Sequence, residues 1–358
     1  MLSGCALRAA RPDQPSVQSA HTDSFLPDAL TMSTEQRTST QPISGLRDVD
    51  IVDVAIVGGG PAGLSAAIWL ARYLHRVVLV DSGDPRNWET RGVNGFLGLP
   101  GIRPAELRGL GRDEARAAGA TLIDGMCDTV RRRHDGIFEL ALAGGSTIRS
   151  RRLLLAIGLK DVWPDIPGLE HVYGANAHVC PDCDGRECVG KKVVVIGSGR
   201  KAVGLALDIT TWTRDIIICT NGEPAALDLP EYCTKLDTLN IPVLESPITC
   251  VRHSGERVIS IDFEDGLALD TDKIFFAIGQ YPADDLGAQL GCERDKDGHI
   301  VVDDAYHTSV RDCYAAGDII PGPQLAIAAA GDGAIAALAI HKSLVPMERR
   351  LEKLVTAD

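Results

Sequence analysis

The chain has little that would suit it to a membrane. Among its 358 residues, no apolar run approaches the roughly 20 residues that a membrane-spanning helix needs. The longest candidate, QLAIAAAGDGAIAALAI at 324–340, is interrupted by Gly331, Asp332 and Gly333. We therefore expect no membrane partner.

Positive charge is also scarce. The 36 Lys and Arg residues against 49 Asp and Glu residues give a formal net charge of −13, which argues against nonspecific binding to nucleic acid. The basic runs at 131–133 and 151–152 are short enough to be solvated loop charges. Nucleic acid is not an expected partner.

The cysteines are too sparse for a disulfide-stapled fold. Only four residues precede Cys5 in the opening MLSGC, which resembles a lipoprotein cleavage box but leaves no room for a signal. This cysteine usage, without a credible export signal, predicts a cytoplasmic protein. Of the ten cysteines, seven are scattered singly, and most of these are expected to be inert: Cys5, Cys127, Cys219, Cys233, Cys250, Cys292 and Cys313.

The length indicates two domains, because single cores tend to stop growing at roughly 250 to 300 residues. Residues 1–47 are rich in Ser, Thr, Gln and Pro without periodicity and predict a flexible tail, in which Met32 is a possible alternative start. A second short tail is expected at 351–358. An apolar fraction of 45% is ordinary for the globular part between them.

A strand, a glycine turn, a helix and a second strand follow one another from Ile51 in IVDVAIVGGGPAGLSAAIWLARYLHRVVLVD. Gly58, Gly60 and Gly63 form the GxGxxG pattern that makes the tight turn, lets backbone amides approach a pyrophosphate and lets helix and strand pack closely. Asp81 stands at the end of the second strand, where a carboxylate can accept hydrogen bonds from a ribose. This unit predicts a dinucleotide site.

The same pattern recurs from Lys191. Gly197, Gly199 and Ala202 repeat the glycine turn, but the offset that leads to Asp81 in the first unit leads here to Thr220, which is not an acid. No Lys or Arg follows this strand to hold a 2′-phosphate, and Arg200 and Lys201 inside the turn are the nearby cations. The second unit is therefore either a nucleotide site without the usual ribose carboxylate or a degenerate structural copy.

Two further segments suggest domain edges. LLLAIGLKDVWPDIPG at 153–168 and KIFFAIGQYPADDL at 273–286 are each a buried strand running into Ala-Ile-Gly. They predict a first domain at 48–164, an inserted domain at 165–284 and a return to the first domain at 285–350. In the returning part a strand ends in Gly317 and Asp318 before an Ala-rich helix, an arrangement that suits a polyol chain as well as plain packing.

The box CPDCDG places Cys180 and Cys183 shortly before the second glycine unit. A Cys-x-x-Cys pair suits thiol–disulfide exchange, because a helix start and the neighbouring thiol lower the pKa of the attacking thiol, and the two-residue spacing lets the other thiol resolve a mixed disulfide. Zinc is the main alternative, with Cys188 and His178 nearby, yet no second ligand pair follows. An inert disulfide or a pair of ordinary buried thiols also remains open, and we expect no metal.

The order of these motifs over residues 50–345 resembles the low-molecular-weight thioredoxin reductases. That resemblance implies an α/β fold of two Rossmann-like, three-layer ββα domains, in which an FAD domain is interrupted by a smaller NAD(P)-binding-type domain. It also implies a homodimer, a thioredoxin-like protein or a small dithiol or disulfide as substrate, and electron flow from nicotinamide to flavin to disulfide.

Site residues follow from the same resemblance. Cys180 and Cys183 would be the redox pair and Asp184 the acid or base beside them. The second turn, with Gly197, Gly199, Arg200, Lys201 and Ala202, would take the nicotinamide nucleotide. Contacts to FAD would come from Gly58, Gly60, Pro61, Ala62, Gly63, Asp81, Asn94, Gly158, Gly317, Asp318, Gln324, Leu325 and Ala326.

The chain departs from this family at three places. Its GDPRN…GFLG sequence is closer to that of the thioredoxin-reductase-like dithiol oxidases. The basic cluster that binds NADPH is missing, and Leu325 stands where a Gln commonly touches the flavin. The leading expectation is an NAD(P)H-dependent reductase. The alternatives are a dithiol oxidase that passes electrons through FAD to oxygen, and an enzyme whose second site takes another ligand or whose electrons come from a ferredoxin-type donor.

Overall fold

The computed structural model describes residues 50–227, 229–277 and 279–350. The expected tails at 1–47 and 351–358, the start at Met32 and Ile278 of the second Ala-Ile-Gly lie outside these residues. The helices are α1 Pro61–Arg72, α2 Pro104–Ala118, α3 Leu169–Val172, α4 Pro181–Asp184, α5 Gly199–Ile209, α6 Pro230–Leu239, α7 Leu286–Gln289 and α8 Ala326–Leu344, with 3₁₀ turns η1 Gly185–Cys188 and η2 Met347–Arg349.

The first sheet has seven strands in the order β3-β2-β1-β6-β5-β4, with β17 added beside β6. Strands β1, β2, β3 and β17 run parallel to their neighbours, whereas β4, β5 and the first half of β6 form an antiparallel meander. The strand bounds are β1 Ile51–Val57, β2 Val77–Asp81, β3 Thr121–Asp124, β4 Cys127–Arg132, β5 Phe138–Leu142, β6 Thr147–Leu155 and β17 Cys313–Ala315.

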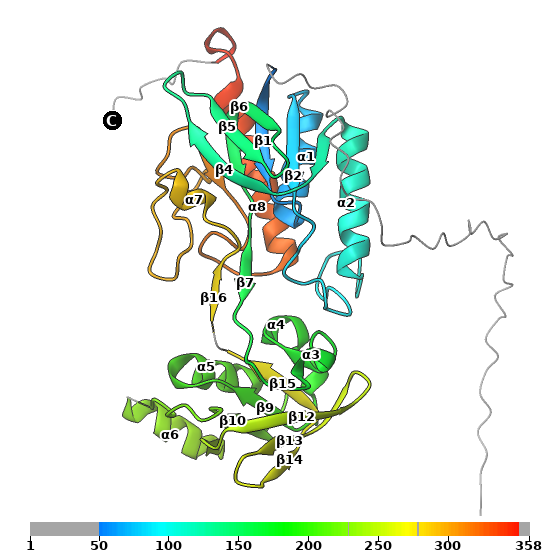
Figure 1. Cartoon of the computed structure of the whole chain (residues 1–358), viewed down its shortest axis with the longest axis vertical. Helices are drawn as coiled ribbons and strands as arrows, with labels where there is room; N and C mark the ends of the chain where they lie inside the picture. The colour runs from blue at the N-terminus through cyan, green and yellow to red at the C-terminus, as the bar shows by residue number, and fades with distance from the viewer. Residues whose placement is uncertain (1–49, 228, 278, 351–358) are drawn as a thin grey trace, which may run out of the picture. The chain divides into compact units, whose positions relative to one another are not determined.

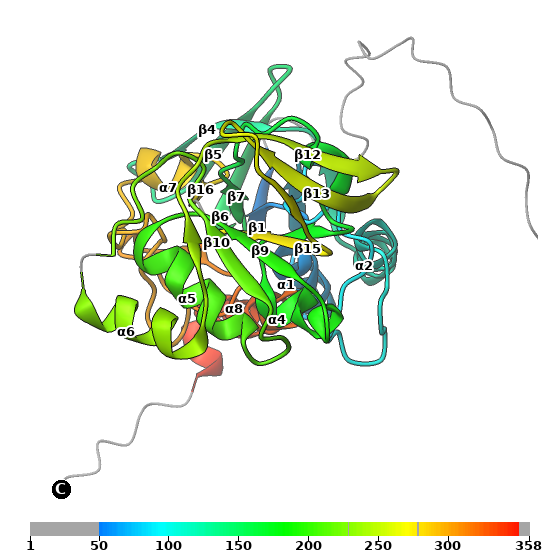
Figure 2. The same ribbon diagram turned by 90° about the horizontal axis from the view of Figure 1, so that it is seen from below.

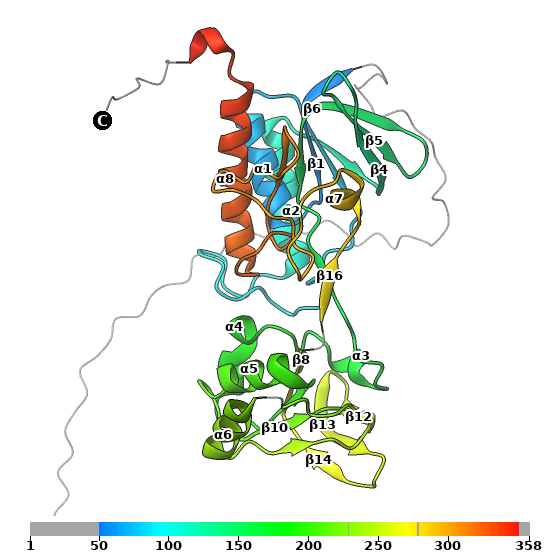
Figure 3. The same cartoon turned by 90° about the vertical axis from the view of Figure 1, so that its left-hand side faces the viewer.

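Strand β1 is buried on both faces, which explains its nearly continuous apolar sequence. Val54 and Ile56 point into the core under α1 and α8, while Ala55 and Val57 point to the opposite face, toward the core that contains β4 and β5 side chains. This is the period-2 alternation of a strand, with both sides covered. Figure 3 shows α1 and α8 together on one side of this sheet and β4 and β5 on the other.

The second sheet has five parallel strands in the order β11-β10-β9-β15-β8. Helices α5 and α6 cover one face, and the antiparallel sheet β12-β13-β14 covers the other (Figure 2). The bounds are β8 Ala177–His178, β9 Val193–Ile196, β10 Ile216–Cys219, β11 Val243–Leu244, β12 Ile248–Ser254, β13 Arg257–Phe263, β14 Ala268–Asp270 and β15 Lys273–Phe276.

Two short strands connect the sheets. β7 Leu159–Asp161 leaves the first sheet and β16 Gln280–Pro282 returns to it, and the two pair antiparallel, as Figure 1 shows. The α/β fold with two Rossmann-like parallel cores agrees with the expectation from the sequence. The exact boundaries at 164/165 and 284/285 stay a prediction.

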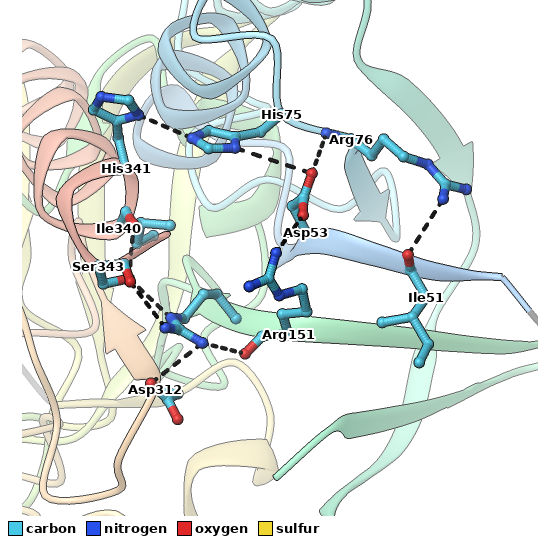
Figure 4. A network of polar contacts seen from close by, with 10 residues as sticks. Ile51, Asp53, His75, Arg76, Arg151, Asp312, Ile340, His341 and Ser343 are labelled. Atoms are coloured by element: carbon cyan, nitrogen blue, oxygen red, sulfur yellow. Dashed lines mark hydrogen bonds and ion pairs between the residues drawn. The ribbon is translucent and has the colours of Figure 1, made fainter. Parts of the chain in front are cut away.

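A histidine pair joins the ends of two helices in the first sheet's helical layer. His75, just after α1, lies with Nε2 3.0 Å from Nδ1 of His341 in α8, and its Nδ1 lies 4.0 Å from Asp53 (Figure 4). Burial lowers the pKa of both rings; Asp53 opposes this at His75, where His341 and Arg151 add to it. Folding therefore favours the neutral form of both side chains.

This pair predicts an acid-sensitive contribution to stability. A histidine whose folded pKa lies below its unfolded value of 6.5 contributes stability above pH 6.5 and loses it as pH falls through the folded pKa. We expect the difference in unfolding free energy between wild type and H75Q/H341Q to be constant above pH 7 and to shrink below pH 6.5. Chemical denaturation from pH 5 to 8 measures it. H134Q, at an exposed turn, should track the wild type at every pH.

Candidate active site

The first glycine turn is shaped by close backbone approach. Gly58 adopts φ +107°, and a Cβ there would lie 2.1 Å from the Ala156 carbonyl oxygen. A Cβ on Gly63 would lie 1.9 Å from the Gly58 oxygen, so this third glycine serves helix–strand packing. Gly60 caps α1 and has open space where a Cβ would be, with Pro61 as the first helical residue. The free helix amides therefore face a cavity, which suits a pyrophosphate.

That cavity, of about 580 Å³, gathers most of the residues expected to touch FAD. The glycines, Asp318 and the two cysteines of the CPDC box reach it from separate parts of the chain. Of the predicted flavin residues, Gly63 does not line it. Those that do are Gly58, Gly60, Pro61, Ala62, Asp81, Asn94, Gly158, Gly317, Asp318, Gln324, Leu325 and Ala326, together with Cys180, Cys183 and Asp184.

Asp81 is buried and already paired with two arginines. Its Oδ2 accepts hydrogen bonds from Arg108 and, at 2.9 Å, from Arg112, and its Oδ1 accepts from the Gly83 amide at 3.1 Å. A Cβ on Gly59 would lie 2.1 Å from this carboxylate. The arginines stand one helical turn apart on α2, a spacing that could have been read from the sequence but was missed. Ribose binding by Asp81 stays a prediction.

Arg86 organises the other side of the cavity and was not singled out from the sequence. Its guanidinium donates to both oxygens of Asp161 at 2.7 and 2.8 Å, to Asp318 at 3.2 Å and to Gln324 at 2.7 Å. Gln280 donates to the same Asp161 and exchanges hydrogen bonds with Gln324. Because Asp161 lies on β7 and Gln280 on β16, this network ties the connecting strands to the cavity wall.

Two carboxylates face the positive charge of Arg86. Burial opposes its charge, yet Asp161 and then Asp318 hold its pKa above the ordinary value. Burial raises the pKa of Asp318, and Arg86 works against that rise. One Asp318 oxygen is bonded to Arg86, and the residue lines the cavity, where a ribityl hydroxyl could donate to its carboxylate. These residues fit a flavin dinucleotide.

Removing this cation is expected to be costly. The side chains of Arg86 and Asp161 are 18% and 4% exposed, so R86M leaves the buried Asp161 and the partly buried Asp318 without their cation. We expect an unfolding free energy lower by about 3 kcal/mol and faster loss of bound flavin. Urea denaturation and the absorbance of flavin released on gel filtration measure the two effects. K160M removes a neighbouring but exposed ion pair with Asp84 and should cost under about 1 kcal/mol.

Cys180 and Cys183, the predicted redox pair, lie at the start of α4. Cys180 is the N-cap, and its sulfur accepts a hydrogen bond from the Cys183 amide at 3.2 Å. Hydrogen bonds from the Cys183 thiol and from that amide lower the pKa of Cys180, although burial opposes this. The pKa of Cys183 is raised, because its thiol gives its hydrogen bond to Cys180 and because it is buried. Of the two thiols, Cys180 is therefore the one that loses its proton more readily. Asn94 donates to the Cys183 carbonyl at 2.9 Å.

Asp184 closes the same turn. Its amide donates to the Cys180 carbonyl at 3.2 Å, and its side chain is 12% exposed. Oδ2 lies 3.4 Å from Nδ1 of the buried His178. Its negative charge opposes ionisation of both thiols, so the carboxyl group lies near them, as a proton-transfer group requires.

The second glycine turn is arranged differently from the first. Gly199 donates its amide to the Ala225 carbonyl at 2.9 Å, so an amide that would face a phosphate is already bonded to the chain. The Ala225 amide is in turn bonded to Glu245 at 2.8 Å, and the Thr220 hydroxyl donates to the Glu223 carbonyl. In this arrangement the turn does not fit a pyrophosphate unless the segment 221–227 moves.

None of the five residues predicted for this second site lines the 580 Å³ cavity. Arg200 and Lys201 are exposed, and Ala202 is buried with its Cβ 3.5 Å from a Cβ built on Gly197. Their nucleotide-binding role stays a prediction.

Neither a metal cluster nor a membrane span occurs in the described ranges. No group of three or more His, Cys, Asp or Glu side chains in residues 50–227, 229–277 and 279–350 is arranged to hold a metal. Over the same part of the chain, no helix is long and apolar enough to cross a membrane.

Comparison with known proteins defines the class. The family model described as pyridine nucleotide-disulphide oxidoreductase matches residues 52–333, and the chain belongs to this family. It is accordingly a thioredoxin-reductase-like oxidoreductase, and the family implies FAD as the cofactor with NAD(P)H as the nucleotide partner.

Individual relatives agree with this assignment. The chain is 30% identical over 279 residues to thioredoxin reductase tcpT of Claviceps purpurea, which covers 75% of this chain and 87% of that protein. Among solved structures, HlmI is 34% identical with a TM-score of 0.78, covering 82% of this chain and 93% of that one. A putative thioredoxin reductase TrxB of Bacillus anthracis is 29% identical with a TM-score of 0.76, covering 82% and 98%. The chain is thus a flavin-dependent disulfide oxidoreductase.

Proposed function

We propose that the protein is an NAD(P)H-dependent reductase of a thioredoxin-like protein, and that it cycles the Cys180–Cys183 pair between disulfide and dithiol. The observation that carries this proposal is a single cavity lined by the first glycine turn, Asp318 and both cysteines. In the overall reaction, NAD(P)H and one proton reduce one disulfide to two thiols, and NAD(P)⁺ is formed. Hydride and electron transfer belong to the bound flavin; the chain supplies position and charge.

A second candidate is a dithiol oxidase, in which a dithiol and oxygen give a disulfide and hydrogen peroxide. The hydrogen bond from Gly199 to Ala225 favours it, because that bond occupies an amide needed for a nicotinamide dinucleotide. The lack of a carboxylate at Thr220 points the same way.

Anaerobic mixing separates the two candidates. NADPH, and in a second run NADH, should bleach the visible flavin band of the purified holoenzyme within seconds if the reductase proposal holds. No bleaching by either nucleotide, together with oxygen uptake on adding a small dithiol, would replace it with the oxidase. A ferredoxin-type donor is tested in the same apparatus with a reduced ferredoxin.

Assembly and location are part of the proposal. A homodimer and a cytoplasmic location are expected from the resemblance and from the cysteine usage, and both stay predictions. Light scattering of the holoenzyme during gel filtration measures the assembly, with a mass of about twice 38.1 kDa expected.

A further inference from the structure

Two buried basic side chains lie beside the proposed redox pair and have no role so far. His178 ends β8, two residues before Cys180, and its side chain is 4% exposed. Lys273 begins β15, which pairs with β8 in parallel, and its side chain is 8% exposed. The sequence offered His178 only as a possible zinc ligand and did not single out Lys273.

The contacts of Lys273 fix which atoms carry protons. Its ammonium lies 2.9 Å from Glu187 Oε2, 3.1 Å from the Ala175 carbonyl and 3.5 Å from Nε2 of His178. An ammonium has three protons to donate and no lone pair, so Nε2 of His178 must accept. A ring that accepts at Nε2 carries its proton on Nδ1.

Nδ1 is the nitrogen that faces the site. It lies 3.4 Å from Oδ2 of Asp184, within contact distance of that carboxyl group. Glu187, on η1, has a side chain that is 55% exposed, and its ion pair with Lys273 connects the buried ammonium to solvent. The order of groups from the thiols outward is Asp184, His178, Lys273 and Glu187.

We propose that His178 is a positioning residue for proton transfer at the redox pair: Lys273 holds it in the Nδ1–H form, and in that form it holds Asp184 toward the cysteines. This inference rests on the disulfide chemistry proposed above. When the Cys180 thiolate attacks a disulfide, a new S–S bond forms and the old one breaks. The leaving thiolate takes the proton of the Asp184 carboxylic acid, and the carboxylate that remains is the form that the His178 Nδ1–H stabilises.

The tautomer is measurable directly. Free histidine prefers the Nε2–H form, so ¹⁵N chemical shifts of His178 in the FAD-containing enzyme, labelled at histidine, report whether Lys273 imposes the other form. We expect Nδ1–H in the wild type and in K273R, and a shift toward Nε2–H in K273M. An Nε2–H ring in the wild type, or no change in K273M, would overturn the proposal.

Kinetics test whether His178 acts through Asp184. In a C183S background, which traps the adduct, the rate of mixed-disulfide formation at Cys180 is followed by quenched mass spectrometry with bis(2-hydroxyethyl) disulfide, whose leaving thiolate is basic. We expect H178L and D184N each to slow this reaction by about 10- to 100-fold. The double variant should be no slower than the slower single one. Multiplying losses would show that His178 acts independently of Asp184, against the proposal.

Ellman's reagent is the control disulfide for this experiment. Its leaving thiolate is stable without a proton, so the same variants should react within about twofold of the background. H178Q, which keeps an N–H donor, should recover most of the loss seen in H178L, and it remains informative if H178L binds less flavin. H171L, at an exposed histidine on α3, is expected to be neutral.

The two proposals fail separately. These reactions use no nicotinamide nucleotide, so failure of NAD(P)H to bleach the flavin leaves them unaffected. If D184N reacts normally while H178L is slow, the proposed roles of Asp184 and of His178 as its positioning residue both fall, and the reductase proposal does not.

Discussion

Cys180→Ser is expected to lower the rate of disulfide exchange by at least about 1,000-fold, because serine at neutral pH offers no thiolate to attack a disulfide. The Cys183 thiol and amide stabilise the negative charge on the Cys180 sulfur, and no corresponding stabilisation acts on Cys183, whose pKa is raised. Turnover with a thioredoxin-like protein or a small disulfide measures the effect. Flavin content and the unfolding midpoint should stay at wild-type values.

Companion variants define what this loss means. C183S should retain one round of attack and accumulate a mixed disulfide at Cys180, which mass spectrometry detects. C233S removes an exposed cysteine on α6 and should leave turnover unchanged. Turnover of C180S within tenfold of wild type would remove the pair from the mechanism.

The second large effect is expected at a glycine where two helices cross. A Cβ on Gly333 in α8 would lie 2.0 Å from the carbonyl oxygen of Ala62, the second residue of α1. G333A must therefore push α8 away from α1, at a cost of about 3 kcal/mol in unfolding free energy. Because the first turn of α1 faces the cavity, we also expect the variant to lose flavin more readily.

Gly331 is the matched control on the same helix. It is exposed, and a Cβ there would meet nothing within 4 Å. G331A should raise the unfolding free energy by up to about 1 kcal/mol, since alanine favours a helix more than glycine does. Urea denaturation of the two variants compares them. Equal stability of G331A and G333A would mean that α1 and α8 cross with room for a methyl group between them.

Much of the fold was readable from local patterns. The strand, glycine turn and helix of each nucleotide unit need only neighbours in sequence, so the positions of Gly58, Gly60 and Gly197 in their turns follow from spacing alone. The Cys180–Cys183 pair was found for the same reason, because its spacing and its helix start are local. Asp81 was found at its strand end, but its pairing with Arg108 and Arg112 was not.

The missed residues act at long range. Arg86 meets Asp161 and Asp318 from positions 75 and 232 residues away, and Lys273 meets His178 across 95 residues. No periodicity marks such pairs, since each side chain alone looks like a solvated surface charge. The sequence also did not reveal the state of the second glycine turn, because its motif is intact. Only the hydrogen bond from the Gly199 amide to the Ala225 carbonyl shows that this amide is already bonded within the chain.

The sequence by itself determined the class of chemistry: two nucleotide-type folds, a thiol pair and an acid beside it, all encoded by residues within a few positions of one another. Only the tertiary structure showed which thiol is stabilised as a thiolate, which cation holds Asp161 and Asp318, and the contacts of His178 from which its tautomer is proposed. These depend on burial and on partners from distant strands, and the low dielectric of a packed interior gives them their strength.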